Sequence, residues 1–217
     1  NTYSQTSNYK IGLTKYSNNG YINFLIENFD MSYGIPPSLE GHINGVDIDM
    51  IMDSYQINYH QDISCLNFEQ FDVKYNFIDY NHKEYVNDDT SYHVLLSKKT
   101  KNLKLEISEN NFILGTELSK KKLEPAGFYL TPITIEKQFS IYGFYERNIH
   151  YFNFDFLSSF RLGKLFVEPG EYNYTNGNSN LILKDEYGDP ILDDEGNNIS
   201  LVNDRKFENV SFSLGIR

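Results

Sequence analysis

The stretch YFNFDFLSSFRL at residues 151–162 alternates between apolar and polar side chains. Its even positions hold phenylalanine and leucine with a single serine, and its odd positions are mostly polar. Because successive side chains of a β-strand point to opposite faces, this pattern predicts a strand with one aromatic face. Residues 71–77 and 210–217 repeat the pattern. A half-buried sheet of a soluble protein alternates in the same way, so alternation alone does not fix the environment.

Working outward from this strand, the chain divides into about nine strands of antiparallel hairpins. Asn18-Asn19-Gly20 is a tight turn of the Asn-Gly type, the strongest short hairpin signal. Several runs exceed the roughly 9–11 residues that cross a bilayer, whereas strands of soluble proteins average about 5–6. The strands are predicted at residues 9–17, 21–33, 46–63, 66–86, 91–107, 112–119, 131–146, 151–166 and 207–217.

The connections between these strands alternate in length. Short turns are predicted at 18–20, 64–65, 108–111 and 147–149. Longer loops are predicted at 34–45, 120–130 and 167–205, and the break at 87–89 is a short exception. Outer-membrane barrels have short periplasmic turns and longer extracellular loops. The sequence therefore predicts an all-β fold, a segment of an antiparallel transmembrane β-barrel with 167–205 as a long extracellular insertion.

Composition narrows the functional classes. The 217 residues are 16 % aromatic with no Trp, and no run of about 18 apolar residues predicts a membrane helix. The net charge of −11 at pH 7 argues against nucleic acid as a partner, because phosphate binding needs basic patches. The single Cys65 cannot form an internal disulfide. No nucleophile elbow, P-loop or catalytic-triad pattern is present, so we expect no enzyme activity.

The ends of the chain predict a larger barrel. An odd number of strands does not close easily, and an open sheet edge in lipid leaves unpaired backbone groups. The first residues lack a signal peptide and an initiating Met. We therefore expect residues 1–217 to be a partial barrel domain whose remaining strands are missing.

Three short motifs follow in order within residues 9–166. They are SYGIP at 32–36, followed by VDIDM at 46–50 and Tyr55; DYNHKE at 79–84; and LGTE at 114–117, followed by Pro125 and LTP at 130–132. In these motifs the chain resembles the barrel region of TonB-dependent outer-membrane receptors, in the branch of zinc-uptake and related metal receptors. Asp47 stands where that family carries an arginine, and the plug, its TonB-contact segment and the closing strand are absent.

The resemblance implies an open arc of a barrel of about 22 strands around a plugged lumen. It implies energy-coupled uptake of a scarce nutrient, such as a metal ion or metal chelate, at the outer membrane of a Gram-negative bacterium. The implied partners are the plug, the remaining strands, the TonB energy complex and the small-molecule or metal substrate. Two other functions remain open: a passive outer-membrane channel or structural barrel, and a soluble all-β binding module.

Candidate ligand sites lie in the loops and at the strand ends. His42, with Glu40 and Asp47 nearby, is a candidate site for capture of a metal such as zinc. The acidic repeat within 185–199 resembles a calcium loop but lacks its final glutamate, and two Asp- and Gly-containing turns explain it as well. The lysine cluster 120–122 is positioned to meet anionic lipopolysaccharide or lipid, or to form a solvated, charge-balancing face. No cofactor is expected otherwise.

Overall fold

The computed structural model describes residues 3–37, 43–65, 68–86, 91–127, 132–149, 154–169, 185, 187, 189–192, 194, 196 and 205–216. Within them the chain folds into nine long strands and no helix. The strands are β1 (Ser4–Ser17), β2 (Gly20–Ile35), β3 (Val46–Cys65), β4 (Phe68–Val86), β5 (Val94–Glu109), β6 (Phe112–Gly127), β7 (Thr134–Ile149), β8 (Phe154–Pro169) and β9 (Arg205–Ile216).

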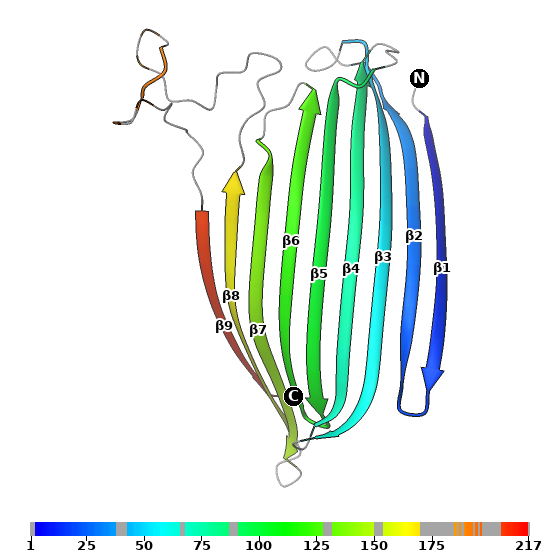
Figure 1. Cartoon of the computed structure of the whole chain (residues 1–217), viewed down its shortest axis with the longest axis vertical. Helices are drawn as coiled ribbons and strands as arrows, with labels where there is room; N and C mark the ends of the chain where they lie inside the picture. The colour runs from blue at the N-terminus through cyan, green and yellow to red at the C-terminus, as the bar shows by residue number, and fades with distance from the viewer. Residues whose placement is uncertain are drawn as a thin grey trace.

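The nine strands form one antiparallel sheet in simple sequence order (Figure 1). Each strand pairs with the strands before and after it in the chain, and β1 and β9 are the two edges, so the sheet is not closed. The strands are 12 to 20 residues long. At about 3.3 Å per residue, the 16-residue strands extend over about 50 Å. No described helix is long and apolar enough to span a membrane.

The connections are sorted between the two ends of the sheet. At the lower end in Figure 1, β1, β3, β5 and β7 end and β2, β4, β6 and β8 begin, with two to four residues between the two strands of each pair. At the opposite end, β2, β4, β6 and β8 end and β3, β5, β7 and β9 begin, with six or more residues between the two strands of each pair. The predicted alternation between short and longer connections is confirmed.

The predicted number, order and antiparallel pairing of the strands are confirmed, but three predicted connections are wrong. Residues 64–65 were expected to form a turn, whereas they end β3. Residues 120–130 were expected to form a loop, whereas β6 continues to Gly127 and pairs with β7 as far as Leu123. Residues 147–149 were expected to form a turn, whereas they belong to β7. Charged and amide side chains interrupt the apolar pattern within 120–127 and 147–149, but the backbone groups of these residues continue the pairing between strands.

The sheet has almost no core of its own. Val46 and Ile48, at the start of β3, are the buried hydrophobic residues among those described. Large apolar side chains are instead exposed across the sheet. In water, a single sheet would leave these side chains solvated. What the sheet can contact therefore depends on which side chains lie on each of its two faces.

Candidate functional site

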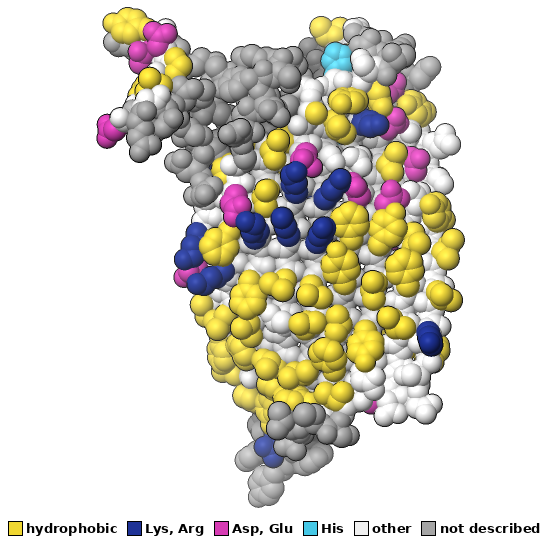
Figure 2. Space-filling model, viewed as in Figure 1, with side chains coloured by type: hydrophobic (Ala, Val, Ile, Leu, Met, Phe, Trp, Pro, Cys, Tyr) yellow, Lys and Arg dark blue, Asp and Glu magenta, His cyan; other side chains and the backbone are white. Residues whose placement is uncertain are grey.

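One face of the sheet carries a continuous apolar band. We call it the front face, which faces the viewer in Figure 2, and the opposite face the back face. Directly paired residues of neighbouring strands share a face, so the register assigns every side chain. The band consists of Ile11, Leu13, Ile22, Phe24, Ile26, Tyr55, Ile57, Tyr59, Phe71, Val73, Tyr75, Phe77, Leu103, Leu105, Ile107, Leu114, Leu118, Phe139, Ile141, Phe160, Leu162, Val210, Phe212 and Leu214.

The apolar band is exposed to its surroundings. Leu118 and Phe139, on the interior strands β6 and β7, are 44 % and 41 % exposed, although strands flank them on both sides. Soluble monomers rarely expose contiguous apolar patches larger than a few hundred Å². A band that crosses all nine strands therefore indicates a surface that contacts an apolar medium or another molecule.

A row of lysines borders the band on the side of the longer connections (Figure 2). Lys101, Lys120 and Lys137 stand directly opposite one another on β5, β6 and β7, and Lys99 stands opposite Lys122. We call these five residues the lysine row. Three of them are paired with carboxylates: Lys99 with Asp79 at 3.6 Å, Lys122 with Glu124, and Lys137 with Glu168 at 2.7 Å.

Above the lysine row, on the side of the longer connections, the front face is polar and the back face is apolar, which is the reverse of the arrangement below the row. On the front face the hydroxyl of Ser32 donates to Asp49 at 2.6 Å, and Asp49 stands opposite Lys83. On the back face Val46 and Ile48 are each only 4 % exposed, and the hydroxyl of Tyr80 donates to the sulfur of Met50 at 3.3 Å. Burial, and to a lesser extent Tyr33, raises the pKa of Tyr80.

Below the lysine row the back face holds a network of charged side chains. Arg161 donates to Glu117 at 2.7 Å and to the hydroxyl of Ser140 at 2.9 Å. The hydroxyl of Tyr142 donates to Glu106 at 2.8 Å, and the guanidinium of Arg161 lies 5.7 Å from the centre of the Tyr142 ring. Ser140 is fully buried beneath these groups. The network fixes several charges on the back face of the sheet.

Glycine allows this network to lie flat on the sheet. A Cβ added to Gly115 would come within 2.3 to 2.7 Å of ring atoms of Tyr142. The Tyr142 ring therefore covers the Gly115 backbone, and any side chain at that position must displace it. Gly143 plays the same role on the front face, where an added Cβ would meet the ring of Phe160 at 2.3 Å.

A second polar cluster lies on the back face near the short turns. The Nδ1 of His60 is 2.8 Å from Asp72, its Nε2 is 3.4 Å from Asp62, and its ring stacks on Tyr21 at 5.2 Å. Sequence reasoning missed this cluster and the network around Arg161, since their members come from different strands. Only the register brings them together.

The predicted metal site stays a prediction. His42 and Glu40 lie outside the described residues. Asp47 lies in β3 opposite Gly34 and Tyr85, and burial, followed by the charge of Asp47 and a hydrogen bond with it, raises the pKa of Tyr3. Among the residues that the structure describes, no three metal-ligating side chains come together.

Other polar residues proposed from sequence have structural partners. His82 Nε2 is 3.0 Å from Glu84 and its Nδ1 is 3.3 Å from the Tyr80 hydroxyl. In the acidic repeat, the Asp185 carboxylate accepts backbone N–H bonds from Tyr187 and Asp189, both at 2.9 Å. Asp185 thus caps a turn, as in one of the two explanations of the repeat.

No protein-family model matches this chain, and no curated protein is significantly similar to it. The functional interpretation therefore depends on the geometry of the two faces and on the resemblance of the three motifs.

Proposed function

We propose that this chain forms part of the wall of a β-barrel in the outer membrane of a Gram-negative bacterium. The observation that carries the proposal is the apolar band on the front face, bounded by the lysine row where the two faces exchange character. Below the row the front face would contact lipid and the back face would line the barrel interior. Above the row the strands would project into water, where their polar front face is solvated.

The height of the band supports this assignment. Lys101 lies in the lysine row and Glu109 ends β5. The eight residue-to-residue steps from Lys101 to Glu109 span about 26 Å along the strand, or about 20 Å of membrane thickness at a tilt near 40°. An outward apolar band of a bacterial barrel is about 25 Å tall, and the outer membrane is thinner than average.

The two sheet edges support a larger barrel. An edge strand in lipid would leave backbone N–H and C=O groups unpaired, at a cost of several kcal/mol each. We infer that β1 and β9 pair with further strands, in a barrel of about 22 strands as the motif resemblance implies.

For the activity we propose energy-coupled uptake of a scarce nutrient, such as a metal ion or chelate, by a TonB-dependent receptor. The network of Arg161, Glu117, Tyr142 and Glu106 supports this assignment, because it presents fixed charges to the barrel interior. Such charges can hold a plug domain through hydrogen bonds. The residues described here would hold the plug and select the substrate, and the energy complex would act through the plug.

Planar-bilayer recording of the whole protein that contains this chain tests the activity. If a plug fills the lumen, the protein should insert without a steady conductance, and release of the plug by urea should produce one. A steady conductance of the untreated protein would instead establish a passive channel. A cooperative melt of a monomer in buffer without detergent would establish a soluble module and refute the membrane assignment.

A further inference from the structure

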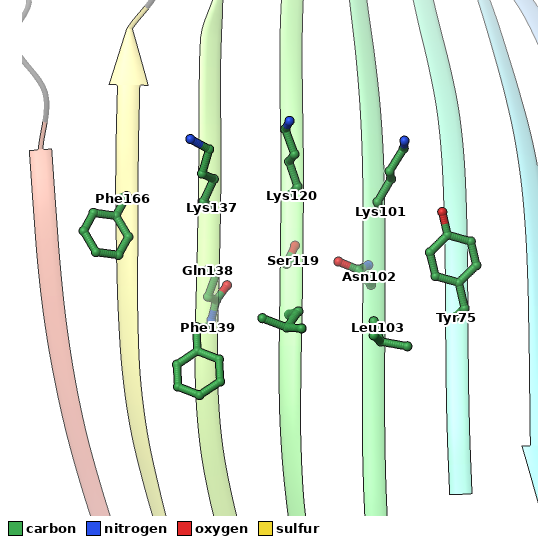
Figure 3. A pocket seen from close by; sticks show the side chains of 11 residues that line it. Tyr75, Lys101, Asn102, Leu103, Ser119, Lys120, Lys137, Gln138, Phe139 and Phe166 are labelled. Carbon is green, nitrogen blue, oxygen red and sulfur yellow. The ribbon is translucent and has the colours of Figure 1, made fainter.

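A shallow depression lies where the lysine row meets the apolar band (Figure 3). Its volume is about 410 Å³, and it spans β4 to β8 on the front face. In Figure 3 the side chains of Lys101, Lys120 and Lys137 rise from its upper edge toward the longer connections. Leu103 and Phe139 lie below them. The depression thus combines a cationic rim with an apolar floor.

The rim carries positive charge that the described residues do not balance. Lys101 and Lys120 stand directly opposite each other, an arrangement that is destabilising for like charges. Among the described residues, neither has a carboxylate within ion-pair distance, whereas the neighbouring Lys137 is held by both oxygens of Glu168. Lys101 instead lies 5.9 Å from the centre of the Phe77 ring. An anion between the two ammonium groups would remove their repulsion.

The floor is apolar and open. Leu118 and Phe139 stand directly opposite each other, and Leu103 stands opposite Leu118, so three apolar side chains form a continuous strip. Tyr75 and Phe166 lie on the two sides of this strip (Figure 3). A hydrocarbon chain laid along the strip would be flanked by aromatic rings, while its polar end would reach the lysines.

We propose that this depression binds a phosphate-bearing glycolipid of the outer leaflet, with its phosphate between Lys101 and Lys120 and an acyl chain on Leu103, Leu118 and Phe139. The inference deepens the proposed function and rests on it, because it requires the front face to contact lipid. A phosphate monoester carries a charge of about −1.5 to −2 at pH 7, which matches the two lysines. Free phosphate would use the rim but would leave the apolar floor empty.

The direction of the site agrees with this ligand. The lysines lie on the side of the longer connections and the floor on the side of the short turns. In the proposed membrane orientation this places the phosphate at the outer surface and the acyl chain within the outer leaflet.

Native mass spectrometry of the whole detergent-purified protein tests the site. Three probes are compared: phosphorylated lipid A, the same acylated sugar without phosphate, and inorganic phosphate. The test variant is Lys101→Gln/Lys120→Gln. The control is Lys15→Gln, an exposed lysine on the same face that lies opposite Ile22, away from the row. Lys101→Arg/Lys120→Arg keeps the charge and controls for altered folding.

We expect the double Gln variant to bind phosphorylated lipid A about ten-fold less than the unaltered protein, a loss typical of exposed charge-assisted contacts. The Lys15→Gln and double Arg variants should bind normally, and the phosphate-free lipid should bind weakly to all. Equal binding of both lipids, or full competition by inorganic phosphate, would overturn the inference.

Failure of the proposed function gives a different result. If the unaltered protein remains monomeric without detergent, the front face does not contact lipid and the proposed function fails with this inference. If the protein requires detergent but the double Gln variant binds phosphorylated lipid A normally, only the inference about the lysines fails.

Discussion

Ile141→Arg is expected to destabilise the protein strongly in a membrane and weakly in water. Ile141 lies on the front face opposite Thr116 and Leu162 and is 39 % exposed. It lies four residues beyond Lys137 in β7. This separation is about 14 Å along the strand, or about 10 Å of depth at a tilt near 40°. Ile141 would therefore lie near the middle of the apolar band.

The expected magnitude follows from that depth. Arginine at the midplane of a barrel's lipid face costs about 2–4 kcal/mol, which lowers the folding equilibrium constant about 30- to 700-fold. If the same surface were in water, a charge at a partly exposed position would change stability by about 0.5 kcal/mol or less. Urea titration of the folding equilibrium in phospholipid vesicles, with constant slope for all variants, measures the difference.

Two matched variants distinguish the effect of depth in the membrane from the effect of which face carries the charge. Leu118→Arg places the charge on the same face but close to the lysine row, where the cost should fall to about 0–1 kcal/mol. Ser159→Arg places it on the back face of β8, opposite Phe144, where a polar interior should tolerate it. The assignment of the front face to lipid is refuted if Ile141→Arg costs no more than Ser159→Arg.

Three further predictions concern the back face and the loops. Gly115→Ala should lower the free energy of unfolding by about 1–3 kcal/mol in the same titration, because the added Cβ displaces the Tyr142 ring. In a Tyr142→Ala background the same substitution should cost almost nothing. An equal cost in both backgrounds would contradict the packing of Tyr142 on Gly115. Arg161→Ala should cost about 1 kcal/mol or less, because its side chain is 42 % exposed, and a double-mutant cycle with Glu117→Gln should assign much of that cost to the pair; purely additive effects would mean that the pair is not coupled. His42→Ala should weaken zinc binding by the whole protein in a calorimetric titration, and an unchanged affinity would eliminate the predicted metal site.

The strand pattern could be predicted because it is local. Alternation such as that in residues 71–77, and the Asn-Gly turn before β2, are visible in single segments. The extension of β6 could not be predicted, because its Lys120–Lys122 cluster is polar on both faces. Its pairing with β7 provides partners such as Glu136, which lies 3.2 Å from Lys121. Cross-strand register, which the sequence does not display, outweighed the local composition.

The exchange of faces at the lysine row depends on register in the same way. Within one strand, alternate side chains stay on the same face above and below the row. A single strand therefore shows only that its front-face residues change from aromatic to charged. Only the alignment of Lys101, Lys120 and Lys137 across three strands reveals a boundary. Arg161 and Glu117 are 44 residues apart, and no sequence motif links them.

The most direct test of the central claim places one tryptophan at a time on the two faces of β7. The chain contains no tryptophan, so each introduced tryptophan is the only one within residues 1–217, and its fluorescence can be compared with that of the unaltered protein. Phe139 on the front face and Phe144 on the back face are 41 % and 36 % exposed, which makes Phe139→Trp and Phe144→Trp a matched pair. In vesicles of phospholipids with brominated acyl chains, we expect strong quenching of Phe139→Trp and little of Phe144→Trp. Equal quenching of the two variants, or none of Phe139→Trp, would contradict a lipid-facing front surface.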